Sequence, residues 1–266
     1  MAIAYDSSSQ GYAGPGGGYA SWSHTCTGTN LILLVSVDES ANSNGVSGIT
    51  YNGVALTQIG TVSNGNTQSL WYLINPATGS HTIAVSGSHT TNTIWQGAIS
   101  YTGAKQTGQP DSFNTATSQT TVQTISTTVV ANNSWLVAAF GVSDNNPPSA
   151  GTGTTSRQGF SGSGSGFIGD SNGTVASGSR SLVSNNAAND TTVAVIASIA
   201  PTDQIISTVS DTNVTTESVS AVVQSQSVSA SVLDTNVSTD TTKFSISNKW
   251  SPEIVPPTTI WTINNN

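Results

Sequence analysis

The residues of this chain that could bind a metal are few and lie mostly in expected loops. His24 and Cys26 are two residues apart on an expected strand, so their side chains share one face, but two ligands do not make a zinc site. Calcium fits better, because Ca²⁺ takes carboxylate and amide oxygens from loops. Such oxygens occur at Asp38-Glu39, Asp144-Asn145, Asp170 with Asn172, and the Asp-Thr-Asn runs at 211–213 and 234–236. These clusters also form Asx turns without an ion, so we predict no cofactor and keep a bound Ca²⁺ as an alternative.

Catalytic arrangements are harder to find than metal ligands. Glycoside hydrolysis needs two carboxylates, about 5–9.5 Å apart, that flank the bond to be cleaved. The only glutamates are Glu39, Glu217 and Glu253, and nothing in their spacing marks a pair. The glycine-rich stretch 159–169 contains Gly-Ser-Gly patterns, but no helix follows as in a nucleophile elbow, so we interpret it as a flexible loop. The composition permits a Ser-His-Asp triad, yet we predict that the chain is not an enzyme.

Aromatic side chains offer a different kind of chemistry, which is stacking on the faces of sugar rings. The candidates are Tyr12, Tyr19, Trp22, Trp250 and Trp261. Tryptophans also pack in hydrophobic cores, and most tryptophans of this chain could be core residues. We predict that Trp22, Trp250 and Trp261 contact a partner protein or a glycan.

The composition excludes several classes of function. The net charge is −8, and only 7 % of the residues are charged, against roughly 25 % in ordinary soluble domains. The five basic residues form no patch, so we expect neither nucleic acid nor an anionic membrane as partner. No apolar run approaches the roughly 18 residues of a membrane span. Cys26 is the only cysteine, so we expect no disulfide within the chain and a thiol buried on an inward strand face.

Strands must position these groups, because no window of the sequence has the period of a helix. The clearest local signal is Asn52-Gly53 between the alternating runs 46–51 and 54–59, which predicts a hairpin with a type I′ turn. Further strands are predicted at 31–37, 68–73, 81–85, 93–102, 121–129, 134–142, 173–182 and 191–199. This spacing predicts an all-β fold, namely an antiparallel, jelly-roll-like β-sandwich. Its core should contain Trp71, Trp95, Trp135 and Phe140.

The residue composition changes at Ala200-Pro201, where we place a domain boundary. Residues 1–200 form the expected sandwich, with a glycine-rich loop or loosely held strand at 1–20. Residues 201–266 alternate Ser, Thr and Val, and the segment 211–217 recurs at 234–240 with a period of 23 residues. We therefore predict a small β-rich repeat or stalk, followed by an extended tail that carries Trp250 and Trp261.

Several turn and core motifs occur along residues 20–200. They are Trp22-Ser23-His24-Thr25-Cys26 leading into 31–37, the segment 46–57, Leu70-Trp71-Tyr72-Leu73, Asn75-Pro76 with Gly79-Ser80-His81, Asn133-Ser134-Trp135 and Asp170-Ser171-Asn172-Gly173. With these motifs the chain resembles a family of β-sandwich modules of tailed-phage structural proteins (decoration and fibre type) and bacterial surface proteins. The resemblance implies a structural role and supplies no catalytic residue.

The N-terminal segment favours the virion over an exported protein. Residues 1–19 contain no Lys, no Arg and no apolar run, as a secretory signal would require. The body nevertheless has the composition of an extracellular β-protein, which suits a virion component made in the host cytoplasm and released by lysis. A leader removed before the first residue is the other explanation.

We therefore expect a non-enzymatic structural virion protein: a capsid decoration, head-fibre or tail-associated protein. It would form a homo-oligomer such as a trimer and would bind major capsid or tail proteins. Two alternatives stay open at the cell surface. One is a carbohydrate-binding adhesin that recognises host surface glycans, and the other is an extracellular filament subunit.

Overall fold

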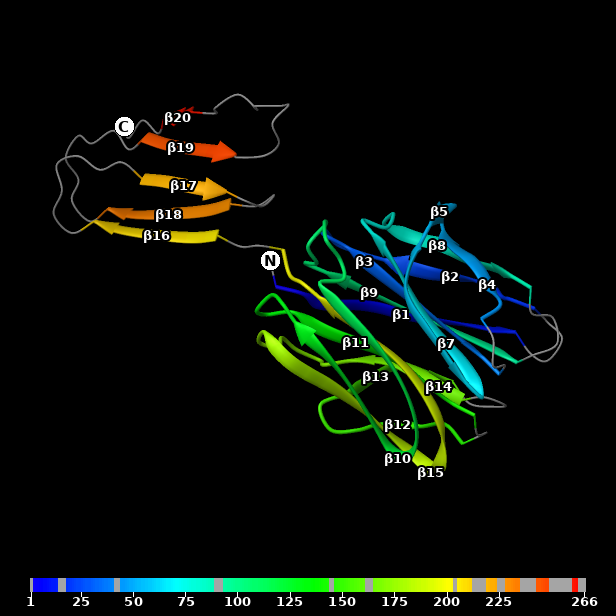
Figure 1. Ribbon diagram of the computed structural model, residues 1–266. Coiled ribbons are helices and arrows are strands. Elements are labelled where there is room, and N and C mark those ends of the chain that lie inside the picture. Colours follow the sequence, from blue (N-terminus) through cyan, green and yellow to red (C-terminus); the bar gives the residue numbers. More distant parts are fainter. Residues whose placement is uncertain are drawn as a thin grey trace. The chain divides into compact units, whose positions relative to one another are not determined.

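The computed structural model describes residues 2–202, with gaps at 14–17, 41–43, 89–92, 144–145 and 161–164, and then the strands of a C-terminal region (Figure 1). The chain divides into two compact units, Ala2–Pro201 and a second unit from Thr202 onward. The described residues contain strands and turns but no helix, and the strands of the first unit all pair antiparallel. The predicted all-β sandwich fold is confirmed.

The first unit contains three sheets, whose strands follow here in their spatial order. The first sheet is β1 (Ala4–Ala13), β9 (Ile94–Thr102), β3 (Ile32–Glu39), β7 (Asn66–Ile74) and β6 (Thr57–Asn64). The second is β2 (Ser21–Cys26), β8 (Gly79–Gly87), β4 (Val46–Tyr51) and β5 (Val54–Ala55). The third is β10 (Ser112–Val129), β15 (Gly178–Ile199), β11 (Trp135–Val142), β14 (Ser165–Asp170) and β13 (Thr155–Phe160), with β12 (Ser149–Ala150) beside β15. The orders β1-β9-β3-β7 and β2-β8-β4-β5 are those of a jelly roll.

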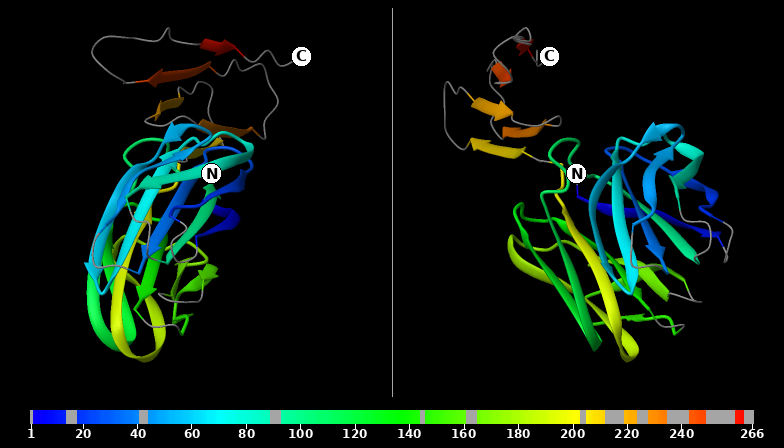
Figure 2. Two further views of the ribbon diagram at one scale, coloured as in Figure 1. Left: turned by 90° about the vertical axis from the view of Figure 1, so that its right-hand side faces the viewer. Right: turned by 45° about the vertical axis from the view of Figure 1, so that its right-hand side comes forward.

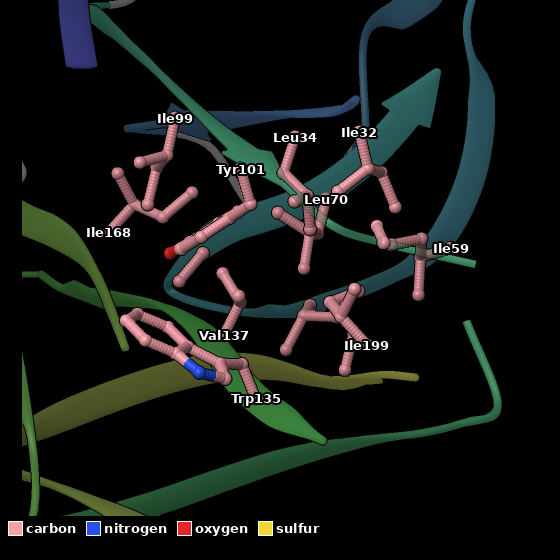
Figure 3. Close-up of a cluster of buried hydrophobic side chains, with 14 of the residues drawn as sticks. Ile32, Leu34, Ile59, Leu70, Ile99, Tyr101, Trp135, Val137, Ile168 and Ile199 are labelled. Carbon is pink, nitrogen blue, oxygen red and sulfur yellow. The ribbon is translucent and has the colours of Figure 1, made fainter. Parts of the chain in front are cut away.

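The first sheet is the middle layer, because its central strand β3 is buried along its whole length. Leu33 and Val35 point toward the second sheet, and Ile32 and Leu34 point toward the third. Figure 3 shows the latter face, where side chains of β3, β7 and β9 meet those of β11, β14 and β15. The uninterrupted apolar run Leu31–Val35 is therefore explained by burial on both faces.

The strands β10 and β15 are unusually long, and they fold the third sheet over itself. A register shift interrupts their pairing between Thr120 and Val122, beyond which the strands pair again as far as Val129 and Gly178. This far part of the hairpin covers the outer face of β11, where Phe140 and Leu136 pack on Ile125. The second half of the unit is therefore a sandwich of its own.

The two sandwiches have the same strand order. The first sandwich consists of β1 to β9 and the second of β10 to β15. In the second, β10 corresponds to β1 and β2, and β15 corresponds to β8 and β9. The pairing registers give the correspondence residue by residue. Corresponding residues are Ser7 and Ser112, Cys26 and Val129, Gly79 and Gly178, Ser100 and Ser198, and Asn30 and Asn133, whose φ angles are 53° and 60°.

The two sandwiches face each other in a nearly reciprocal way (Figure 2, blue to cyan against green to yellow). The strand β6 contacts β10 and β15, and its counterpart β13 contacts β1 and β9. Such reciprocity is the signature of a two-fold interface, here within one chain. Where the sequence predicts one sandwich, the structure therefore has two of the same kind.

Some local predictions are confirmed and others are wrong. Asn52 and Gly53 adopt φ angles of 49° and 77° between paired residues of β4 and β5, as a type I′ turn requires. Of the stretch 159–169, predicted as a flexible loop, residues 159–160 end β13 and residues 165–169 belong to the fully buried strand β14, while 161–164 lie outside the described residues. The glycines of β14 are needed for packing, because a Cβ at Gly166 would collide with the carbonyl oxygen of Phe140. The predicted strand 173–182 begins only at Gly178.

The second unit pairs strands that lie 23 residues apart and lead into the two copies of the repeat. The strands β16 (Ile205–Asp211) and β18 (Val228–Asp234) are parallel, and Asp211 lies opposite Asp234. The strands β17 (Val219–Val223) and β19 (Lys243–Asn248) are also parallel, and β20 (Ile260–Thr262) pairs antiparallel with β19. The Asp-Thr-Asn turns, apart from the backbones of Asp211 and Asp234, lie outside the described residues.

Candidate functional site

A pocket of about 310 Å³ opens at the edge of the second sandwich, where the two halves of β10 approach each other. Its lining consists of Ser112, Phe113, Asn114, Ser126, Thr127, Thr128 and Ser179. Five of these side chains carry a hydroxyl group, one carries an amide and one is aromatic. The pocket is therefore polar but uncharged.

Hydrogen bonds across the bend of β10 hold the walls of the pocket together. The amide Nδ2 of Asn114 donates to the carbonyl oxygen of Ser126 at 2.9 Å, and Thr127 Oγ1 donates to Ser112 Oγ at 3.0 Å. The ring of Phe113 rests against β6, since a Cβ at Gly60 would lie 3.5 Å from its Cδ2. Phe113 is still 54 % exposed, so part of the ring is open to solvent.

The corresponding place in the first sandwich is filled by His24, the counterpart of Thr127. The imidazole Nδ1 lies 2.8 Å from Ser9 Oγ, and Nε2 lies 3.1 Å from Ser100 Oγ. Ser9 Oγ also accepts a hydrogen bond from Trp22 Nε1 at 2.9 Å. The edge that is open in the second sandwich is thus closed in the first.

The His24 network has the residue types of a hydrolase triad but a different geometry. Ser100 Oγ donates to Asp6 Oδ2 at 2.6 Å, so the acid reaches the imidazole only through a second serine. Only 1 % of His24 is exposed. Burial lowers the pKa of its imidazole to about 4, although the Asp6 carboxylate acts in the opposite direction. His24 is therefore a neutral structural group that joins β1, β2 and β9.

One buried ion pair ties the two sandwiches together. Arg157 binds Asp170 in a bidentate manner, with Nε–Oδ2 and Nη2–Oδ1 distances of 2.8 and 3.0 Å. Tyr101 of the first sandwich donates its hydroxyl to Asp170 Oδ2 at 2.7 Å, and the guanidinium lies 4.3 Å from the ring centre of Tyr5. Burial, with the Asp170 carboxylate, raises the pKa of Tyr101 well above its ordinary value. This cluster is committed to the interface.

A second buried carboxyl group lies at the same interface without full pairing. Asp38 Oδ1 accepts from Asn66 Nδ2 at 3.3 Å, and Oδ2 has no hydrogen-bond partner among the described residues. The carboxyl group of Asp38 points at Gly141, which is the residue of the second sandwich that corresponds to Asp38. A Cβ atom at Gly141 would collide with Asp38 Oδ2. Burial, and after it the neighbouring Glu39, raise the pKa of Asp38 well above its ordinary value.

The predicted metal ligands are placed as follows. His24 and Cys26 both face inward on β2, and burial raises the pKa of the free Cys26 thiol. Asp170, one of the proposed calcium ligands, is bound by Arg157 instead. Within the described part of the chain, no three His, Cys, Asp or Glu residues gather so that they could hold a metal ion. Asp144 lies outside the described residues.

The predicted aromatic contacts are scattered. Trp22 is half-buried against the core of the first sandwich and bonded to Ser9. Trp250 lies outside the described residues, and so does the side chain of Trp261, whose backbone belongs to β20. Tyr19 donates to Glu39 Oε1 at 2.7 Å. Tyr12 is 52 % exposed and stacks on Trp95, with 4.2 Å between the ring centres. The predicted role of the tryptophans in binding stays a prediction.

Sequence reasoning missed the pocket, because it assigned no strand to the segment around Phe113 and Asn114. A signal was present in the sequence. The pair Asp6-Ser7 recurs as Asp111-Ser112 at the start of the second sandwich, and Asp111 Oδ2 accepts from the backbone of Ala131 as Asp6 Oδ2 does from that of Thr27.

Comparison with protein-family models, with curated proteins and with solved structures finds no match to this chain. The resemblance to virion and surface modules therefore remains a prediction from turn and core motifs. The described residues include no helix of the length and apolarity needed to cross a membrane.

Proposed function

We propose that the chain is a non-enzymatic structural protein of a virion, namely a capsid decoration, head-fibre or tail-associated protein that works by binding other subunits. One observation carries this proposal. The described groups best suited to catalysis are all buried in structural roles: His24 joins strands of the first sandwich, and Asp38 and Asp170 lie at the interface between the sandwiches. The side chains left at the surface are largely uncharged and suit contact with other proteins or glycans.

The fold gives the proposal further support by analogy. Jelly rolls recur in viral capsid proteins and in lectins, although a fold alone does not define a function. In the second unit, β16 and β18, which lead into the two repeat copies, pair in parallel at an offset of 23 residues, and such pairing suits a fibre or stalk. Strands of this kind also join strands of neighbouring subunits by edge pairing. In this account residues 201–266 assemble or dock the protein, and the two sandwiches are displayed.

The experiment that tests the virion role is mass spectrometry of gradient-purified particles from the source culture. We expect the chain at a fixed ratio to a major capsid protein. Its recovery only from cells or from a free fibre fraction would contradict the proposal.

The division of labour has its own test, which is light scattering on the full chain and on a chain that ends at Pro201. We expect a closed oligomer for the full chain and a folded monomer for the shortened one. An unchanged oligomer after the truncation would contradict the role of residues 201–266.

Two other candidates remain. A carbohydrate-binding surface adhesin is favoured by the exposed rings of Tyr12 and Phe113, which lie among uncharged polar side chains. An extracellular filament subunit would instead give open-ended polymers in the same light-scattering experiment.

A further inference from the structure

We propose that the outer face of the Tyr12 ring, beside the amides of Gln10 and Gln158, binds the ring of a neutral sugar. This inference does not depend on the virion role, because it concerns only the edge of the first sheet at β1. It rests on three observations: an exposed ring held in an aromatic stack, two linked amides on the same face, and the neutralised charges of the strands that carry them.

Tyr12 is the outer member of a stack of three aromatic rings. Its ring centre lies 4.2 Å from that of Trp95, which in turn lies 5.7 Å from that of Phe160. Trp95 and Phe160 are buried, whereas Tyr12 is 52 % exposed. Tyr12 belongs to β1, the edge strand of the first sheet, and Trp95 belongs to the adjacent β9. The ring face of Tyr12 that is turned away from Trp95 is therefore turned away from the sheet and open to solvent.

The amides of Gln10 and Gln158 lie beside this ring. Gln10 and Tyr12 are two residues apart on β1, so their side chains project from the same face. Gln158 of β13 donates from Nε2 to Gln10 Oε1 at 2.8 Å. Gln10 Nε2 and Gln158 Oε1 make no hydrogen bond to any other described residue. One donor group and one acceptor are thus left for the hydroxyl groups of a ligand, each of which both donates and accepts.

The backbone of β9 at Gly97 shows that the ring stack and the amides meet on one face. Gln10 lies opposite Gly97 in the pairing of β1 with β9. A Cβ atom at Gly97 would lie 3.6 Å from Phe160 Cε1 and 3.7 Å from Gln158 Cγ. The ring stack and the amide pair therefore approach the same residue from the same side, and Tyr12 is the ring that remains accessible there.

The charges of the surrounding strands are already paired. The strands β1, β9 and β13 carry only two charged residues, Asp6 and Arg157. Asp6 Oδ2 accepts from Ser100 Oγ at 2.6 Å, and Arg157 is bound to Asp170. These strands therefore offer a ligand an aromatic face and amide groups, and no unpaired charge with which to bind an ion.

A pyranose with equatorial hydroxyl groups, as in chains of β-linked glucose, matches these features. Such a sugar has an apolar ring face that is bounded by hydroxyl groups. The Tyr12 ring would contact the apolar face, and the free amide atoms of Gln10 and Gln158 would bond the hydroxyls. Because the stack already fixes the Tyr12 ring, little side-chain freedom is lost on binding.

Saturation-transfer difference NMR on the full chain tests this site. The neutral probes are cellotriose and N,N′-diacetylchitobiose, whose ring substituents are equatorial, and 3′-sialyllactose is the charged comparison. We expect ring-proton signals from at least one neutral probe and weaker binding of the charged one. The absence of signals from both neutral probes, or a preference for the sialylated one, would overturn the proposal.

Four variants locate the site, each with its fold checked by circular dichroism. Tyr12→Ala should weaken binding roughly fivefold to tenfold, whereas Tyr12→Phe keeps the ring and should bind almost as the wild type does. Gln10→Ala should weaken binding about threefold. The control Phe113→Ala removes an equally exposed ring from the second sandwich and should leave binding unchanged.

Unchanged binding in Tyr12→Ala, or loss of binding in Phe113→Ala, would place the site elsewhere and overturn the proposal. Oligomer formation, which tests the structural role, should be unaffected by all four variants, so the two proposals fail independently.

Discussion

The two sandwiches of the first unit share a strand order but use the same edge differently. In the first, Asp6, Ser100, His24 and Ser9 form a continuous hydrogen-bonded network. In the second, Thr127 makes a single bond to Ser112, and the remaining space is a pocket. The jelly roll therefore tolerates either arrangement. The place that a buried imidazole fills in one copy is an open, polar pocket in the other.

The interface between the sandwiches is also reciprocal in strands but unequal in charge. Asp38 and Gly141 are counterparts, and the carboxyl group of one fills the space that the other leaves. The ion pair of Arg157 with Asp170 occurs on one side only, because Tyr72 stands at the position corresponding to Asp170. A perfectly symmetric interface would place like charges opposite each other near the two-fold axis, and this one avoids that.

The largest effect should come from breaking the ion pair of Arg157 with Asp170, which occurs on one side of the interface only. Asp170→Ala leaves the buried Tyr101 hydroxyl without its acceptor and Arg157 with Asn172 Oδ1 alone, and should lower the free energy of unfolding by about 3 kcal/mol. Urea denaturation measures this change. The control Arg180→Ala removes an exposed arginine that bonds only backbone carbonyls, and should change stability by less than about 0.5 kcal/mol.

A double variant separates the two explanations of that loss. Arg157→Met with Asp170→Leu removes both charges and should recover much of the stability lost in Asp170→Ala, because no charge is left buried and unpaired. If the double variant is no more stable than the single one, the pairing of charges is not what the interface requires.

The next largest effect is a pH dependence that belongs to the first sandwich alone. His24 has a pKa of about 4 when folded and an ordinary value near 6.5 when unfolded. Between pH 6.5 and pH 4, His24 is therefore protonated in the unfolded chain but neutral in the folded chain. Stability should fall as the pH drops from about 6.5 to about 4, by about 3 kcal/mol in total. Denaturation curves across this range measure the loss.

The variant His24→Gln isolates this contribution, since glutamine does not titrate. It should be less stable than the wild type at pH 7 but should lose less stability on acidification. An equal acid-induced loss of stability in both proteins would show that titratable groups other than His24 cause the loss.

Asp38 should act in the opposite direction over a neighbouring pH range. Its pKa is raised in the folded state, so the proton that the folded chain keeps is released on unfolding above the ordinary pKa. Stability from this group is present at low pH and is lost as the pH rises toward the folded value. Asp38→Asn should therefore stabilise the protein at pH 7 by about 1–2 kcal/mol, as measured by thermal unfolding. A destabilised Asp38→Asn would mean that the carboxyl group is paired in a way the present geometry does not contain.

The smallest effect should be in the second sandwich. Thr127→Val removes one hydrogen bond beside an open pocket, where the half-buried Ser112 can turn to water, and should cost at most about 1 kcal/mol. His24→Ala, the matched change in the first sandwich, leaves several buried groups without partners and should cost more. Equal losses, measured by urea denaturation, would remove the contrast between a closed and an open edge.

The sequence was sufficient for the fold class and for part of the local structure. The Asn52-Gly53 hairpin and the buried runs of β3 and β11 follow from turn chemistry and hydrophobicity, which are local properties. The strand β14 could not be predicted in this way, because Gly166 and Gly169 suggest a loop unless the close approach of neighbouring backbones is known. The duplication was hidden because identical counterparts, such as Ser100 and Ser198, are isolated positions, and core counterparts such as Cys26 and Val129 share burial but not residue type.

The candidate site was harder to predict than the fold. A pocket depends on which side chains meet across the bend of β10, and Ser112 and Thr127, which bond there, are fifteen positions apart in the sequence. The tryptophans that attract attention in the sequence are occupied by packing, as Trp22 is, or lie outside the described residues, as Trp250 does. Only the register between the two sandwiches links His24 with Thr127.

The most direct test of the account is a crystal structure of the reciprocal swap, His24→Thr with Thr127→His. If one side chain decides whether the edge is closed or open, the imidazole should fill the second sandwich, with Nε2 bonded to Ser198, and a pocket should open in the first. A pocket that stays at Phe113 in the swapped protein would contradict the claim that this one position separates the two sandwiches.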